Sequence, residues 1–481
     1  MLEFRPVVFL TGLISCFLAA ALCIPALVDL AYKNPDWKSF TVSALIAGFF
    51  GTLAAVLTRS TAPVKLGVRQ AFLVAALGWV VVSFMAALPF IGMGMHVADA
   101  VFESVSGVTT TGSTVLTELD TLPPGILLWR ALLQWIGGIG IIAMAILILP
   151  MLRVGGMQLF KIESSDSSEK IDSSAFGIVV KLFSVYTGLT ALCGLMYYVF
   201  GMSGFDAITH AMTTLSTGGY STHDSSFEYF ADLRLQWVAT VFMFAGALPF
   251  YLCVKFVRGS FNSLLSDQQV RGFILFLAAS SIAMAAWLCT QRNIDFGTAL
   301  TQTSFNITSV VTTTGFVSVD YTEWGAGAVG AFLILMFIGG CSGSTSGGIK
   351  VYRFQILYVI VRGHIKRLIS PHRVVPLKYN GKPLPEDVPY SILAFLAVFV
   401  GTIAVFTVLL AFLGLDLVTA YSATITAISN VGPGLGSIIG PSGNFQPLPD
   451  AAKWTLSFAM LAGRLEVLSL LIALDPDFWR F

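Results

Sequence analysis

Apolar runs long enough to cross a membrane recur from one end of this chain to the other, and no hydrophilic domain interrupts them. A helix needs about 20 apolar residues to cross a ~30 Å hydrocarbon core. Of the 481 residues, 56% are hydrophobic and only 11% are charged, against roughly 25% charged in soluble domains. We therefore predict an all-α polytopic membrane protein with spanning helices near residues 7–31, 40–58, 69–91, 126–152, 177–201, 234–258, 272–290, 326–362, 388–414 and 452–475.

The distribution of Lys and Arg predicts how these helices are oriented, because cytoplasmic loops retain basic residues and short translocated loops are depleted of them. Three long stretches lack Lys and Arg and a fourth has one, and these are 70–129, 182–233, 383–452 and, with Arg292 alone, 272–349. Basic residues gather instead in 59–69, 255–271 and 350–382. We therefore expect the N- and C-termini on the cytoplasmic side.

The four stretches poor in Lys and Arg resemble one another, and we interpret them as repeats. Each has an apolar helix, an outer-side Asp, a short segment rich in Thr and Ser, a glycine, a polar outer loop and a second apolar helix. Aligned on Gly112, Gly218, Gly315 and Gly432, the central segments read VTTTGS, TLSTGG, VTTTGF and ISNVGP. An N-terminal two-helix domain and four repeats are thus predicted, at 1–62, 63–160, 161–262, 263–370 and 371–481.

The central segment of each repeat is too short to cross the membrane and return as two helices, so we predict a short re-entrant helix followed by an extended strand. The helices would begin at Asp99, Asp206, Asp295 and Asp416. The negative end of each helix dipole would then face the centre of the membrane and attract a cation. Glycine lets the strand aim carbonyl oxygens inward, and rings of carbonyls replace the hydration shell of K⁺. The predicted K⁺-binding residues, with the last two of each three supplying carbonyl ligands, are Thr110, Thr111, Gly112, Ser216, Thr217, Gly218, Thr313, Thr314, Gly315, Asn430, Val431 and Gly432.

Acidic residues crowd the predicted outer side, where few basic residues fall. They are Asp99, Glu103, Glu118, Asp120, Asp206, Asp224, Glu228, Asp232, Asp295, Asp320, Glu323, Asp416 and Asp450. Depletion of Lys and Arg by the orientation rule explains the missing bases but not the abundance of acids. The pattern predicts a vestibule that raises the local cation concentration.

A Gly, Ser and Thr tract at 339–348 breaks the eighth apolar run. It does not match a phosphate-binding loop, because Gly and Lys are not adjacent before Ser or Thr and its flanks are membrane helices. We interpret it as a flexible gate beneath the filter, with a glycine-lined helix crossing as the alternative. Arg464, two residues before Glu466, falls in the middle of the last predicted helix, where a charge is costly and usually functional; a structural pairing with another helix is the alternative. The predicted gate residues are Gly339, Gly340, Gly343, Gly347, Gly348, Lys350 and Arg464.

These motifs resemble those of the superfamily of Trk, Ktr and plant HKT cation transporters. The resemblance is strongest to the Trk branch and covers the whole chain, including two N-terminal helices that Ktr proteins lack. The matching strings are VTTTG, TLSTGGY, VTTTGF, SNVGPGLG, GGCSGSTSGGIK and GRLEVLSLL. The resemblance implies four tandem helix–pore loop–helix repeats with pseudo-four-fold symmetry and K⁺ uptake across a bacterial inner membrane. It also implies that the 339–348 tract is the gate and that Arg464 lies near the pore, below the filter.

The resemblance further implies partners and a selectivity. The partners are a second copy of the chain in a homodimer and a separate cytosolic nucleotide-binding regulatory subunit of the TrkA type. The basic face at 350–382 would suit such a partner or anionic membrane lipid. In the family, glycine in all four strands goes with K⁺ selectivity, and Ser in place of the first glycine goes with Na⁺ preference. Ser113 and the pair Asn430 and Val431 depart from the other repeats, so a mixed K⁺/Na⁺ transporter is an alternative.

Two other classes of function compete with a cation pore. A coupled secondary transporter of another solute would be built from inverted repeats, but these repeats are parallel, each starting and ending inside. A membrane enzyme would need clustered catalytic side chains on opposed helices, and the sequence contains no such set. We therefore expect K⁺ as the bound ion, no organic cofactor and, at a net charge of +1, no nucleic acid partner.

Overall fold

The computed structural model describes residues 3–60, 67–147, 175–230, 232–467, 472 and 475–480, and these are mostly helical. Among them, seven helices are long and apolar enough to cross a membrane. They are α1 (Arg5–Ala31), α2 (Trp37–Thr58), α3 (Val68–Gly92), α5 (Pro124–Leu147), α8 (Ala175–Val199), α13 (Gln268–Arg292) and α17 (Asp387–Phe412). They fall at seven of the predicted spans, and the chain is a multi-pass membrane protein.

Four short helices lie where re-entrant helices are predicted, and each is followed by non-helical backbone. They are α4 (Val97–Val108), α9 (Gly204–Leu215), α14 (Phe296–Val311) and α18 (Leu417–Ser429). Asp295 and Asp416 accept hydrogen bonds from the backbone N–H groups two and three residues on, which fixes the starts of α14 and α18. At α9 the cap is Ser203, whose Oγ also donates to Asp206. Asp99 lies in the first turn of α4.

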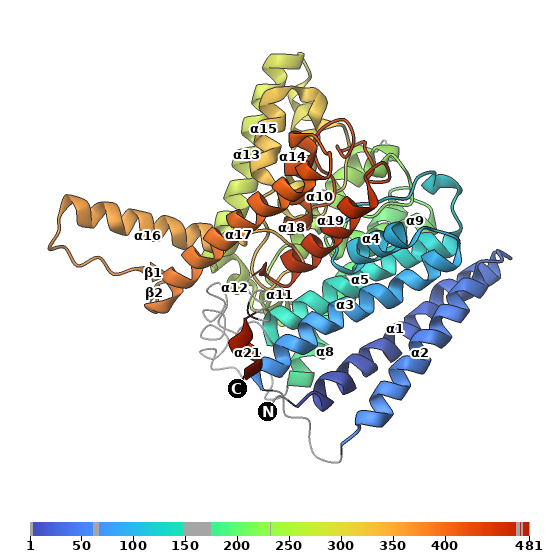
Figure 1. The fold of residues 1–481 in the computed structure, drawn as a ribbon. Coiled ribbons are helices and arrows are strands. Elements are labelled where there is room, and N and C mark those ends of the chain that lie inside the picture. Colours follow the sequence, from blue (N-terminus) through green and yellow to red (C-terminus); the bar gives the residue numbers. More distant parts are fainter. Residues whose placement is uncertain are drawn as a thin grey trace.

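The remaining elements are shorter. The helices are α10 (Leu233–Gly246), α11 (Phe250–Val257), α12 (Phe261–Ser266), α15 (Ala326–Leu335), α16 (Val351–Ile369), α19 (Asp450–Arg464) and α21 (Pro476–Arg480), with 3-10 turns η1 (Leu119–Thr121), η3 (Ser226–Tyr229) and η4 (Tyr321–Trp324). Strands β1 (Lys378–Tyr379) and β2 (Lys382–Pro383) form an antiparallel hairpin. Helix α16 projects away from the body of the molecule (Figure 1), whereas Asn380 of the hairpin turn bonds Gln268 and Asp267 at the start of α13.

The span predicted at 234–258 is wrong as one continuous helix, because α10 and α11 meet at 104°. Pro249 precedes α11, and proline both lacks an N–H and disfavours helical backbone at the residue before it. A carbonyl freed by the break finds a new partner, since Ala247 O accepts the Cys341 N–H at 2.9 Å. The bend thereby provides a docking place for the 339–348 tract.

The last predicted span, 452–475, is also wrong as one helix. Helix α19 ends at Arg464, and Glu466 has a positive φ of 55° that cannot continue it. Arg464 therefore lies at a helix end rather than in mid-helix. The eighth apolar run is broken as predicted, between α15 and α16, and a parallel bridge between Ile338 and Ile349 closes the neck of the loop.

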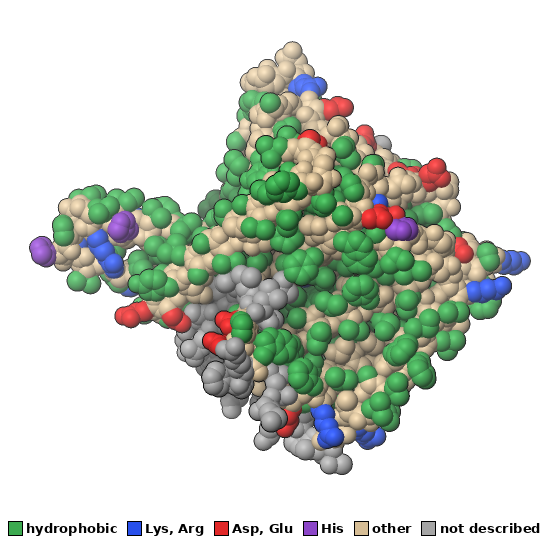
Figure 2. Space-filling view, in the orientation of Figure 1, with side chains coloured by type: hydrophobic (Ala, Val, Ile, Leu, Met, Phe, Trp, Pro, Cys, Tyr) green, Lys and Arg blue, Asp and Glu red, His purple; other side chains and the backbone are tan. Residues whose placement is uncertain are grey.

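The N-terminal helices α1 and α2 pack along each other and against α3, and α1 also packs against α5 (Figure 1). Close contact depends on small residues, since a Cβ on Gly51 would come within 2.9 Å of the Cys16 backbone nitrogen. Asp29, buried in α1, accepts a hydrogen bond from the Gly125 N–H at the start of α5 (2.7 Å). The visible outer face of these helices is covered with apolar side chains (Figure 2), as expected of a surface in contact with lipid.

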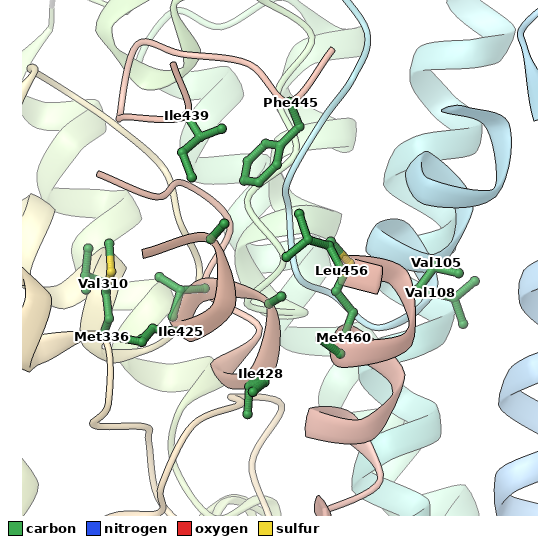
Figure 3. Packing of buried hydrophobic residues seen from close by; sticks show 14 of the residues in the cluster. Val105, Val108, Val310, Met336, Ile425, Ile428, Ile439, Phe445, Leu456 and Met460 are labelled. Carbon is green, nitrogen blue, oxygen red and sulfur yellow. The ribbon is translucent and has the colours of Figure 1, made fainter. Parts of the chain in front are cut away.

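Apolar side chains also fill the interior around the short helices (Figure 3). Val105 and Val108 of α4, Ile425 and Ile428 of α18, and Met460 of α19 are all buried in one cluster. Dense packing of this kind leaves few alternative positions for the helices. The backbone that follows each short helix therefore starts from a fixed place.

Candidate functional site

The non-helical segments that follow the four short helices share one backbone pattern. In each, a residue with positive φ is followed two positions later by a glycine with positive φ. The pairs are Thr110 (54°) with Gly112 (88°), Thr217 (50°) with Gly219 (76°), Thr313 (57°) with Gly315 (81°), and Asn430 (56°) with Gly432 (111°). Side chains are disfavoured at such angles, so glycine is the natural residue at the second position.

This pattern corrects the predicted alignment of the second repeat by one residue. Gly219, not Gly218, has the backbone conformation of the glycines in the other three strands. The helix ends give the same register, because the N–H of Thr217 bonds the carbonyl three residues back (3.1 Å), as the N–H of Thr110 does (3.0 Å). Ser216 consequently caps the end of α9, one position before the strand.

The four strands form a closed ring. A Cβ added to the glycine of each strand would overlap the carbonyl oxygen that precedes the glycine of the next strand. The contacts run from Gly112 to Gly218, from Gly219 to Thr314, from Gly315 to Val431 and from Gly432 back to Thr111. Because a neighbouring carbonyl occupies each Cβ position, glycine is required at all four. The same four glycines line a cavity of about 70 Å³ at the mouth of the ring.

Hydrogen bonds between side-chain hydroxyl and amide groups join residues within and between the strands of the ring. The Thr109 and Thr111 hydroxyls lie 2.7 Å apart, and so do those of Thr312 and Thr314. The Asn430 amide donates to the Thr111 hydroxyl (2.9 Å), which joins the fourth strand to the first. The structure thus brings all the predicted ion-binding residues together in one assembly, buried except for the half-buried Gly112 and Gly315, with Ser216 at its edge.

The 339–348 tract lies against the inner side of this ring, opposite the mouth cavity. The Thr345 hydroxyl accepts a hydrogen bond from the Thr217 hydroxyl (3.1 Å). The Gly347 N–H donates to the Thr313 hydroxyl (2.7 Å). Thr217 and Thr313 both have positive φ, so the tract contacts these two strands at the point where the short helix ends and the strand begins.

The predicted gate glycines are needed where the tract folds tightly. A Cβ on Gly339 would overlap Gly347 O, and one on Gly347 would overlap the Ser429 carbonyl at the end of α18. A Cβ on Gly340 would come within 2.6 Å of the Ser346 hydroxyl. Positive φ angles occur at Gly343 (74°) and Gly348 (62°).

Two cationic side chains lie beside the tract and line a cavity of about 30 Å³. Arg464 is 3% exposed and donates from Nη1 to the Thr345 carbonyl (3.0 Å). Its Nε and Nη2 find no hydrogen-bond partner within the described part of the chain. Lys350 donates to a carbonyl of the same tract. Glu466 forms its ion pair with Arg353 (2.6 Å) and not with Arg464, so this acid does not neutralise the Arg464 charge.

A family model described as TrkH, cation transport protein, matches residues 37–479. The chain belongs to the TrkH family. The Trk system potassium uptake protein TrkI of Halomonas elongata is 46% identical, over 99% of this chain and 97% of that protein. TrkH of Escherichia coli K12 is 34% identical over 100% of both. The crystal structure of the potassium transporter TrkH from Vibrio parahaemolyticus matches with a TM-score of 0.91 at 33% identity, and covers 100% of both chains. The predicted resemblance to the Trk branch and the all-α polytopic fold are thereby confirmed.

In this TrkH-family chain, one predicted vestibule acid has a different role. Glu103 is fully buried, and its Oε1 lies 2.8 Å from Arg130 Nε. Arg130 also donates to the Ser221 carbonyl (2.8 Å) and stacks 4.1 Å from the Tyr220 ring. The pair therefore holds the segment that follows the second strand, and the Glu103 carboxylate is compensated by a guanidinium that lines the mouth cavity. An Arg inside an apolar helix was the available signal, because such a charge needs a buried partner.

Other predicted vestibule acids are partly neutralised. Asp99 pairs with Lys453 (2.6 Å). His223 lies between Asp120 and Asp206, at 3.6 Å from the latter. Burial lowers the pKa of His223, but these two carboxylates outweigh it and raise that pKa above its ordinary value. The hydrogen bond from His223 lowers the pKa of Asp120. Ion pairs to Lys453 and His223 thus join several of these acidic residues to neighbouring segments, and these acids contribute to the structure as well as to the negative potential.

Proposed function

We propose that this chain takes up K⁺ through a selective pore lined by backbone carbonyl oxygens. The observation that carries the proposal is the closed ring in which each filter glycine packs on the carbonyl preceding the next glycine. Carbonyl oxygens in such rings substitute for the water shell of K⁺. The names of the relatives, Trk system potassium uptake proteins, support the same ion.

The proposed ligands follow the corrected register. They are the carbonyl oxygens of Thr111, Gly112, Gly218, Gly219, Thr314, Gly315, Val431 and Gly432, with the strands starting at Thr110, Thr217, Thr313 and Asn430. Four short helices end at these strands, so the partial negative charge of each helix C-terminus adds to the attraction for a cation. The repeats that carry them are the proposed units 63–160, 161–262, 263–370 and 371–481.

The proposed gate is the 339–348 tract together with Lys350 and Arg464. The tract stands on the inner side of the ring, where a departing ion must pass, and its Thr345 and Gly347 bond to filter threonines. Arg464 adds a positive charge in the same place. A cation then meets both a steric and an electrostatic barrier until the tract withdraws.

We also propose the assembly expected from the family. It comprises a homodimer in a bacterial inner membrane, both termini in the cytoplasm, and a TrkA-type nucleotide-binding subunit that controls the gate. Helix α16 follows the tract directly and projects from the body (Figure 1), so a partner bound to α16 could pull on the tract. The basic residues along 350–382 offer that partner, or anionic lipid, a complementary charge.

A second candidate, a mixed K⁺/Na⁺ pore, is favoured by one observation. The Ser113 hydroxyl donates to the Gly432 carbonyl (2.7 Å), so one of the proposed ligands is shared with a side chain. Within the described residues, those that come next in the other three strands, Tyr220, Phe316 and Pro433, make no such contact with a ring carbonyl. The ring therefore departs from four-fold equivalence here, and unequal ligands distinguish ion sizes less sharply.

Growth and flux together test the proposal. Bacteria that lack their own K⁺ uptake systems would express this chain with its TrkA-type partner, and Rb⁺ and Na⁺ uptake would be measured. We expect growth on low K⁺ and Rb⁺ uptake in excess of Na⁺ uptake. Comparable Rb⁺ and Na⁺ uptake would favour the mixed pore, and failure to restore growth would refute both candidates.

A further inference from the structure

One filter strand differs from the other three at the residue before the glycine. That residue is Thr111, Thr314 or Val431 in three strands, and Gly218 in the second. A β-branched side chain stiffens its backbone, whereas two successive glycines leave the peptide between them free to rotate. The second strand therefore needs an external restraint to hold its carbonyl in the ring.

Gln134 of α5 occupies the place of the missing side chain. A Cβ built on Gly218 would overlap the carboxamide of Gln134. The Gln134 Nε2 donates to the Gly218 carbonyl (2.6 Å), and its Oε1 accepts the Tyr220 N–H (3.0 Å). The carboxamide thus forms hydrogen bonds to the residues before and after Gly219. Gln134 itself is fully buried.

The equivalent positions in two other repeats carry methionine. Gly137, Gly246 and Gly463 are equivalent positions in repeats one, two and four. A Cβ added to them would overlap or closely approach the carbonyl oxygens of Val108, Leu215 and Ile428, respectively. Each of these carbonyls lies four residues before the ring glycine of the same repeat. Three residues before these glycines stand Gln134, Met243 and Met460, all fully buried. Methionine has nearly the size of glutamine but cannot donate a hydrogen bond. Of the three positions compared, only the one in the first repeat carries a carboxamide. This carboxamide contacts the second strand, which is the strand without a β-branched residue before its ring glycine.

We infer that Gln134 is a positioning residue for ion selectivity, which holds the Gly218 carbonyl in the ring in place of a side chain on the second strand. The inference rests on the proposed function of the ring. A carbonyl oxygen has two lone pairs, so Gly218 can accept from Gln134 and still face an ion. Without the carboxamide the peptide between Gly218 and Gly219 rotates, the ring loses one fixed oxygen, and its discrimination between K⁺ and Na⁺ falls.

Gln134→Met tests this with little change in volume. The ratio of Rb⁺ to Na⁺ uptake is expected to fall roughly three- to tenfold, the population change that one lost hydrogen bond produces. Met243→Leu, at the equivalent position in the second repeat, is the matched control and should leave the ratio unchanged. A Gln134→Met protein that folds and keeps the wild-type ratio overturns the inference and leaves the proposed function intact, whereas a wild-type chain without Rb⁺ uptake overturns the proposed function itself.

A second variant covers the case in which Gln134→Met alone does not fold. The double change Gln134→Met with Gly218→Thr copies the residue types found elsewhere in the ring, and Gly218 does not have a positive φ that would forbid a side chain. We expect this double variant to fold and to recover a Rb⁺ to Na⁺ ratio within about twofold of wild type. A double variant that folds without recovering the ratio contradicts the inference, because a β-branched residue would then not replace the carboxamide.

Discussion

The ring of four strands and the 339–348 tract are both rich in Gly, Ser and Thr, but they make different contacts. In the ring, each glycine packs directly on a carbonyl of the next strand. The buried Glu103–Arg130 ion pair contacts Tyr220 and Ser221, which follow the second strand. The tract contacts the ring through the Thr345 hydroxyl, which accepts from Thr217, and through the Gly347 N–H, which donates to Thr313. The buried ion pair beside the ring fits the proposal that the ring stays fixed, and the neutral contacts of the tract fit the proposal that it is released.

Removing the support of the ring should have the largest effect. Glu103→Leu leaves Arg130 buried without its carboxylate, which costs about 3–5 kcal/mol. Thermal unfolding of the detergent-solubilised protein should therefore shift sharply downward. The double variant Glu103→Leu with Arg130→Met removes both charges and should recover most of the loss. A single variant as stable as wild type would mean that the ring does not depend on this ion pair.

Breaking the ring at one strand should come next. Gly219→Ala places a methyl group on the Thr314 carbonyl at a φ of 76°, a strain of about 3 kcal/mol. Rb⁺ uptake should fall roughly a hundredfold while the protein remains in the membrane. Gly188→Ala in α8 has open space around the new methyl group and is the control. Normal uptake by Gly219→Ala would argue against the corrected register.

A change in the tract's contacts should act in the opposite direction and less strongly. Arg464→Gln removes a charge and a charge-assisted hydrogen bond to Thr345, so the blocked state loses about 1.5–3 kcal/mol. Rb⁺ flux into proteoliposomes without the regulatory partner should rise about tenfold or more. Lys378→Gln is a charge-matched control, because Lys378 is exposed on β1. Unchanged flux in Arg464→Gln would assign Arg464 a purely structural role.

The outer loops should give the smallest effect, and one that depends on pH. The folded pKa of His223 is raised because Asp206 and Asp120 outweigh its burial. Its contribution to stability is therefore complete below about pH 6.5, the unfolded pKa, and is lost as pH rises through the folded value. The difference in melting temperature between wild type and His223→Gln should be greatest near pH 6 and vanish at alkaline pH. A difference that does not change with pH would mean that the two carboxylates do not hold the charge of His223.

Much of this arrangement could be predicted from the sequence because it is repeated. Four Thr- and Gly-rich segments between apolar runs indicated the short helices, the strands and the glycines of the ring, and the tract at 339–348 was recognisable as a break. The register of the second strand was not predictable, since Gly218 and Gly219 are adjacent and only the backbone angles distinguish them.

The features that the sequence did not predict depend on single contacts between distant segments. From the sequence, Glu103 is interpreted as a surface acid, because its ion pair with Arg130, 27 residues later, is visible only in the structure. The end of α19 at Arg464 has no proline or glycine stop signal at the next residue, so the apolar run seemed continuous. Pro249 did signal the bend between α10 and α11, and in a hydropathy plot the apolar residues on both sides of it conceal that signal.

The contact between Gly432 and the Thr111 carbonyl joins the last strand of the ring to the first. A ribosome makes the first strand long before the fourth, so the nascent chain holds three quarters of a ring with unpaired carbonyls while the rest is synthesised. No truncated product that ends before residue 432 can close the ring. Completion of the ring is therefore a late step in biogenesis, and premature termination leaves its earlier strands without the fourth.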